Sequence, residues 1–211
     1  MTGWFSILIS FIALSVSIVS AWLTWFRKGQ LRITQPTVIF FGPDGRSSSG
    51  RRKHLKVFLR ALLYSTANRG QTIESLYVTL ERESIRQNFS IWVYGDKQLA
   101  RGSGLFIPAE GIACNHHFLL PESGNNFKLT PGKYVLHLYA KKANAPSAQE
   151  LMTVTLDIST DKARELEDAD AGIYFDWEPE QQVYQTYIDR RPPEPLPFAL
   201  LEQLANPSKP N

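Results

Sequence analysis

Residues 72–81 read Thr-Ile-Glu-Ser-Leu-Tyr-Val-Thr-Leu-Glu, and this stretch decides the fold class. Its apolar and polar side chains alternate, in the order Leu76, Tyr77, Val78, Thr79, Leu80, Glu81. An alternation with a period of two residues predicts a β-strand with one buried and one solvated face.

Similar patterns recur along the chain, separated by turn signals such as Asn68-Arg69-Gly70 and Pro131-Gly132. They predict strands at residues 33–41, 56–64, 89–94, 112–120, 134–139 and 152–158, with Phe89, Ile91 and Val93 sharing one face. Roughly seven short strands with this spacing predict a mainly β chain, folded as an antiparallel two-sheet β-sandwich. One short helix is expected around Asp161–Asp168, with Thr160 as its cap.

The aromatic stretch Gly172 to Trp177 has two interpretations. It is either a last strand that docks on the sandwich or the exposed edge of a groove that accepts a peptide strand.

Two segments resemble immunoglobulin-like sandwich modules. Residues 68–78 are similar to their turn and strand, and Leu129-Thr130-Pro131-Gly132-Lys133-Tyr134-Val135-Leu136 is similar to their Pro-Gly-x-Tyr strand entry. This resemblance implies an interaction module, although the paired cysteines of antibody domains are absent. The chain also resembles an uncharacterised bacterial family of single-pass membrane proteins, which implies no function.

The stretch from Trp4 to Phe26 is uncharged and, as a helix, covers about 34 Å, enough to cross a bilayer. Tryptophans lie at both ends of it. Val19-Ser20-Ala21 could serve as a signal-peptide cleavage site, but no basic residue precedes this long apolar run. A retained transmembrane helix is therefore the preferred interpretation.

The basic residues flank this helix on its C-terminal side, where residues 27–56 carry eight Lys or Arg against Asp44 alone. The positive-inside rule then places the N-terminus outside and the domain in the cytoplasm, at a bacterial-type inner membrane. An anionic lipid surface is the expected partner of these cations, and no nucleic acid is expected. The predicted membrane-surface residues are Arg27, Lys28, Arg32, Arg51, Arg52 and Lys53.

Small residues form a stripe along one face of the predicted transmembrane helix, with spacings of three and four. The stripe consists of Ser6, Ser10, Ala13, Ser17, Ser20 and Thr24. Such stripes allow close helix packing in lipid and favour self-association or pairing with another membrane helix. Simple tolerance of small residues in an apolar helix is the competing interpretation.

No set of catalytic residues is complete. Gly102-Ser103-Gly104 and the segment 111–118 resemble the first half of trypsin-like proteases, in which His117 would be the general base. The Gly-x-Ser-Gly segment that would carry the nucleophile is absent downstream of His117. A hydrolase using His117 is therefore the weakest hypothesis.

The lone cysteine, Cys114, excludes a disulfide framework and fits a reducing compartment. Cys114 and His116 share a face of their strand, whereas His117 points the other way. Two ligands, with only His137 or Asp96 as distant candidates, do not predict a metal site. No cofactor is predicted, because no phosphate-binding glycine loop is present.

These observations predict four parts: a non-cytoplasmic N-terminus (1–3), a transmembrane helix (4–26), a cytoplasmic sandwich (27–180) and a Pro-rich, partly disordered tail (181–211). The leading hypothesis is a non-enzymatic scaffold whose domain binds a protein partner. A sensor that binds a small ligand and signals through helix association is the alternative.

Overall fold

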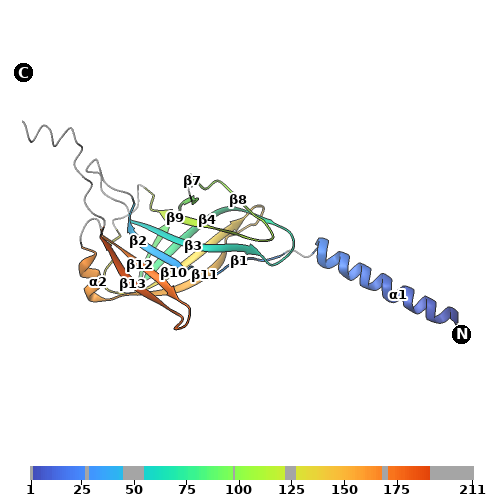
Figure 1. Cartoon of the computed structure of the whole chain (residues 1–211). Helices are drawn as coiled ribbons and strands as arrows, with labels where there is room; N and C mark the ends of the chain where they lie inside the picture. The colour runs from blue at the N-terminus through green and yellow to red at the C-terminus, as the bar shows by residue number, and fades with distance from the viewer. Residues whose placement is uncertain are drawn as a thin grey trace, which may run out of the picture.

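A computed structural model of the chain describes residues 2–26, 29–44, 55–96, 98–121, 127–167 and 171–190. One N-terminal helix leads into a β-sandwich (Figure 1). The helix comprises α1 (Thr2–Ala21) and a wider π-helical turn, η1 (Trp22–Phe26). The segment Gly3–Thr24 is long and apolar enough to cross a membrane. The predicted N-terminal helix is thus confirmed as a helix of spanning length.

The larger sheet has eight strands in the order β13-β12-β2-β3-β9-β6-β7, with β1 also paired to β3. All the strand pairs in it are antiparallel. Its strands are β1 (Leu31–Ile33), β2 (Val38–Pro43), β3 (Leu55–Ser65), β6 (Ile91–Tyr94), β7 (Ala100–Arg101), β9 (Ile112–Leu119), β12 (Ala171–Glu178) and β13 (Val183–Arg190).

The smaller sheet has five strands in the order β11-β10-β4-β5, with β8 also paired to β4. These pairs are antiparallel as well. Its strands are β4 (Gln71–Arg82), β5 (Ile85–Phe89), β8 (Leu105–Ile107), β10 (Gly132–Lys142) and β11 (Gln149–Ile158). The prediction of a mainly β, two-sheet antiparallel sandwich is confirmed.

The core lies between the two sheets and is built from the alternating residues. Leu76, Val78 and Leu80 of β4 are almost completely buried, as are Leu136 of β10 and Leu156 of β11. Fully burying a side chain of this size contributes about 2 kcal/mol. The alternation that was visible in residues 72–81 therefore marks the core-facing side of the smaller sheet.

Residues 89–94 were predicted as one strand with Phe89, Ile91 and Val93 on a common face, and this prediction is wrong. β5 belongs to the smaller sheet and ends at Phe89, whereas β6 belongs to the larger sheet and begins at Ile91. The chain changes sheets at Ser90, so the inward direction is reversed. Phe89 is buried in the first sheet, and Trp92 rather than Ile91 or Val93 is buried in the second.

The short helix is α2 (Thr160–Glu165), and its cap differs from the prediction. The Ser159 hydroxyl accepts a hydrogen bond from the Lys162 backbone N–H, so Ser159 rather than Thr160 is the N-cap. Strand β13 lies beyond residue 180, the predicted end of the domain. The remaining predicted tail lies outside the described residues.

The chain enters the domain at one end of the sandwich. The Gln30 N–H donates to the Thr66 hydroxyl, and the Thr66 N–H donates to the Gln30 carbonyl. We call this the helix-proximal end. β3 runs from Leu55 at the opposite, helix-distal end to Ser65, which at 3.3 Å per residue is roughly 33 Å. β13 ends at Arg190 beside α2, also at the helix-distal end (Figure 1).

Candidate functional site

A groove opens along one side of the sandwich, where the two sheets end. It has a volume of about 520 Å³ and lies between edge strand β11 of the smaller sheet and the β12–β13 hairpin of the larger one. We call it the edge groove. It is lined by Gln35, Thr153, Val154, Thr155, Leu156, Asp157, Ser159, Trp177, Gln182, Val183, Tyr184 and Thr186.

The edge groove exists because the larger sheet extends past the smaller one. Register pairs Ile173 with Ile188, Phe175 with Thr186, and Trp177 with Tyr184, so these residues share the inward face. Ile173 and Phe175 are completely buried, whereas the three inward residues of β13, Tyr184, Thr186 and Ile188, are only half-buried. Among the described residues, no strand pairs with the outer edge of β11. The groove therefore occupies the place of a further strand beneath β13.

Tyr184 fixes the outer wall of the groove. Its hydroxyl accepts a hydrogen bond from the Gln35 side chain (2.8 Å) and donates one to the Pro36 carbonyl (2.9 Å). The Trp177 ring packs edge-on against it at 5.1 Å. Burial raises the pKa of Tyr184 to about 12, so the phenol remains a neutral donor at physiological pH. These contacts fasten the hairpin to the segment between β1 and β2.

Strand β11 forms the other wall and offers two kinds of surface. Val154 and Leu156 point into the sandwich and are buried, whereas Thr153, Thr155 and Asp157 point outward. A strand added beside β11 would continue this alternation, with one set of side chains under Tyr184 and Trp177 and the other beside the threonines and Asp157.

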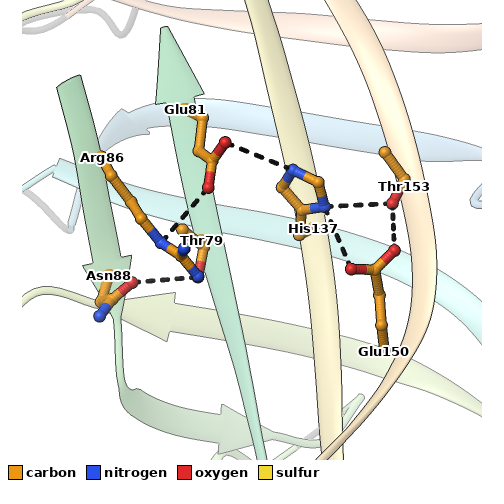
Figure 2. A network of polar contacts seen from close by, with 7 residues as sticks. All are labelled: Thr79, Glu81, Arg86, Asn88, His137, Glu150 and Thr153. Atoms are coloured by element: carbon orange, nitrogen blue, oxygen red, sulfur yellow. Dashed lines mark hydrogen bonds and ion pairs between the residues drawn. The ribbon is translucent and has the colours of Figure 1, made fainter. Parts of the chain in front are cut away.

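A polar network on the outer face of the smaller sheet fixes Thr153, which also lines the groove (Figure 2). The Thr153 hydroxyl donates to Glu150 at 2.5 Å. Its oxygen then accepts from His137 Nδ1, 3.1 Å away. The Thr153 hydrogen bond is the main cause that lowers the pKa of Glu150. The groove is therefore flanked by a carboxylate that stays ionised.

The same network continues across β4 to β5 (Figure 2). His137 Nε2 lies 3.8 Å from Glu81, which forms an ion pair with Arg86 at 3.3 Å. Thr79 donates a hydrogen bond to Asn88 between the same two strands. Cross-strand pairs of this kind hold neighbouring strands in register. The network links β11, the groove wall, to the rest of its sheet.

Cys114 and His116 come together inside the sandwich, as their spacing predicted. Cys114 Sγ lies 3.4 Å from His116 Nε2, and Trp92 Nε1 donates to His116 Nδ1 at 3.2 Å. Burial lowers the pKa of His116 to about 4 and raises the pKa of Cys114 to about 11. Both groups are neutral at pH 7, and a neutral buried thiol is a poor nucleophile. Among the described residues, no three His, Cys, Asp or Glu side chains gather as a metal site.

His117 points away from His116, as predicted for adjacent residues of a strand. It lies on the outer face of the larger sheet, with its ring 4.9 Å from Phe58 on β3. Partial burial is the main cause that lowers its pKa. His117 is therefore separated from Cys114 and His116 by the sheet and packs on an aromatic neighbour.

The predicted helix stripe lies on α1 and η1, where every described side chain is exposed. The Ser17 hydroxyl donates to the Ala13 carbonyl and the Thr24 hydroxyl donates to the Ser20 carbonyl. These two hydroxyls therefore use their protons within their own helix and do not donate to a neighbouring one.

Of the predicted membrane-surface residues, the structure describes Arg32, which lies exposed on β1 and donates to the Gln30 side chain. Arg27, Lys28, Arg51, Arg52 and Lys53 lie outside the described residues. The strand ends that bracket residues 51–53, Pro43 and Leu55, are paired at the helix-distal end.

Comparison of the chain with protein-family models and with curated proteins finds no match.

Proposed function

We propose that this protein is a membrane-anchored, non-enzymatic binding module whose sandwich takes up an extended peptide segment of a protein partner in the edge groove. The observation that carries the proposal is the difference between the two sheet edges. β13 overhangs the smaller sheet and leaves its inward side chains half-covered beside the free edge of β11.

An added strand would both pair with the free edge of β11 and cover the half-buried side chains of β13. The backbone of β11 supplies a row of hydrogen-bonding groups, and the half-covered side chains of β13 supply apolar surface to bury. A second copy of the chain fits less well, because pairing through β11 would bring its own overhanging β13 into the same space. A single extended strand has no such overhang.

The walls of the groove define the chemistry of the peptide. Its inward residues meet Tyr184, Trp177 and Leu156, which favour apolar or aromatic side chains. Its outward residues lie beside Thr155 and Asp157, with the Glu150 carboxylate nearby through Thr153, which favours basic or hydroxyl side chains. We therefore expect an alternating apolar and polar or basic sequence.

Other features support the non-enzymatic, anchored arrangement. Cys114 and His116 are buried as neutral groups, and His117 packs on Phe58. The Tyr134 hydroxyl donates to the Thr130 carbonyl and accepts from the Thr130 N–H, as in the tyrosine corner of immunoglobulin-like sandwiches. The flanking charges favour a cytoplasmic domain at an inner membrane, with α1 as anchor.

The experiment uses full-length protein in nanodiscs and a library of displayed peptides. We expect selected peptides to alternate as described, and Thr186→Trp to weaken their binding at least tenfold by filling the groove. Gln185→Trp is the matched control, because it adds the same ring to the exposed face of β13. Equal affinities of the two variants, or a selection without extended alternating peptides, would contradict the proposal.

A small-molecule sensor is the second candidate, since the groove volume lies within the range of ligand pockets. A small ligand that raises the melting temperature of the wild type and of Gln185→Trp, but not of Thr186→Trp, would favour it over the peptide-binding function.

A further inference from the structure

The connection between the helix and the domain is short. η1 ends at Phe26, and Gln30 is already bonded to Thr66 of the sandwich. Four residue steps span at most about 14 Å in a fully extended chain. With α1 across a bilayer, the helix-proximal end of the sandwich is consequently held at the membrane surface, whatever the domain binds elsewhere.

An exposed aromatic side chain lies at this end. Phe106 of β8 pairs with Thr72 at the start of β4, and 60% of its surface is exposed. Its ring lies over Gly70, where an added Cβ would lie only 2.3 Å from the ring. The ring is therefore fixed on the turn that directly follows Thr66. A phenylalanine exposed to water at this site is unfavourable, whereas the bilayer interface accommodates aromatic rings.

Basic side chains surround this end of the domain. Arg32 lies on β1, Arg69 precedes Gly70, and Lys141 and Lys142 end β10. Glu74, near the start of β4, forms an ion pair with Lys141 at 3.1 Å. In the turns at residues 66–70, 108–111 and 143–148, the acidic residue is Glu110. The balance is positive and is increased by Arg27 and Lys28 in the connection itself. Positive charge beside an apolar ring is the combination that binds anionic lipid surfaces.

We propose that the helix-proximal end of the sandwich rests on the anionic lipid surface, with the Phe106 ring inserted into the interface. The edge groove then keeps a fixed height and direction relative to the membrane. This docking is independent of the occupant of the groove, because Phe106 does not line it.

A second exposed apolar residue, paired with the other end of β4, provides a matched control. Ile85 of β5 is 53% exposed and pairs with Arg82 at the other end of β4. Thr72 and Arg82 are ten residue steps apart, which is roughly 33 Å along the strand. Phe106 and Ile85 are therefore similar in exposure and chemistry but lie at opposite ends of the domain.

The test labels Phe106→Cys and Ile85→Cys with an environment-sensitive fluorophore in the full chain, reconstituted in nanodiscs that contain phosphatidylserine. Cys114 is buried, and the unsubstituted chain serves as the background for its labelling. We expect a blue shift at position 106 and at least threefold stronger quenching by headgroup-spin-labelled lipid than at position 85. Phosphatidylcholine alone should reduce this difference.

Equal quenching at the two positions would overturn the proposal, as would an unshifted spectrum at position 106 in nanodiscs that retain the protein. As a second measurement on the unlabelled chain, Phe106→Asp should increase deuterium uptake of residues 66–72 in anionic nanodiscs but not in detergent. An equal change in both media would indicate a purely structural role for the ring and would also overturn it.

Discussion

His116 shows how a single buried side chain couples folding to pH. Trp92 Nε1 donates to His116 Nδ1, so the neutral ring carries its proton on Nε2, which then faces Cys114 Sγ. Adding a second proton would break the Trp92 hydrogen bond and create a buried charge. Both effects favour the neutral ring, although burial is the largest cause of the pKa near 4.

The free energy of unfolding should therefore fall as the pH falls from 6.5 towards 4. In this window the unfolded chain binds a proton at His116 that the folded chain does not, and the full effect is about 3 kcal/mol. We expect His116→Gln to be less stable at pH 7 but to have a shallower pH dependence between pH 6.5 and 4. Urea unfolding at a series of pH values measures both, and identical pH slopes would contradict the assignment.

For Tyr184 in the groove wall, we likewise predict the effect of a substitution on stability and on its pH dependence. Tyr184→Phe removes hydrogen bonds to Gln35 and Pro36 and should lower the free energy of unfolding by about 1–2 kcal/mol. Tyr187→Phe, on the exposed face of β13, should cost less. Because the folded pKa is raised, the contribution of Tyr184 is present below pH 10 and lost as the pH rises towards 12. Denaturation at pH 7 and above pH 10 tests this, and an unchanged alkaline limb in Tyr184→Phe would contradict it.

At the scale of elements, regular alternation predicted the long strands well. β10 buries every second residue from Tyr134 to Ala140, whereas in β4 and β11 the core-facing alternation is confined to Leu76–Leu80 and Val154–Ile158. The change of sheets at Ser90 leaves no such signal, since a single residue reverses the inward face without a glycine or proline. Distinguishing one bent strand from two requires knowledge of the opposing sheet.

Strand β13 and the edge groove were missed for a different reason. Val183-Tyr184-Gln185-Thr186-Tyr187-Ile188 is rich in β-branched and aromatic residues, and this composition was a usable signal for a strand. The strand was not predicted because it directly precedes the Pro-rich stretch that begins at Pro192, and residues 181–211 were assigned together to a tail. The groove itself has no local signature, because it arises from the unequal extents of the two sheets. Of the two interpretations of Gly172 to Trp177, the docked strand is confirmed, because this stretch lies in β12 between β13 and β2 rather than at an exposed edge. Its last residue, Trp177, also lines the groove.

The helix stripe remains a prediction, and α1 contains its own control. Ser17→Leu and Ser10→Leu should weaken helix association in a membrane two-hybrid assay by enlarging the small-residue face. Ser15 lies on the opposite side of the helix and makes the same bond to a carbonyl four residues earlier, with Phe11. Ser15→Leu should leave association unchanged, and equal effects of all three changes would contradict a specific interface.

For the whole molecule, the sandwich is an elongated body with two unlike ends. The helix-proximal end carries the connection to α1 and the exposed Phe106, while the helix-distal end carries α2, Arg190 and the strand ends that bracket residues 45–54. Counting charges along the sequence placed all the cations of residues 27–56 together. Of these, Arg32 and Lys56 lie in the described part of the chain, and the antiparallel course of β2 and β3 places them at opposite ends of the domain.

The two hydrogen bonds between Gln30 and Thr66 also determine where a mechanical force on the N-terminal helix would enter the domain. β1 runs inward from Leu31, which is paired with Ser65, to Ile33, which is paired with Leu63. A pull on the N-terminal end of β1 therefore acts along the strand axis. The hydrogen bonds that join β1 to β3 and β2 to β3 are perpendicular to this pull, so they are loaded in shear. A peptide strand beside β11 would lie along the same axis. In the complex proposed above, tension between a bilayer and a bound partner would thus be distributed over two ladders of hydrogen bonds.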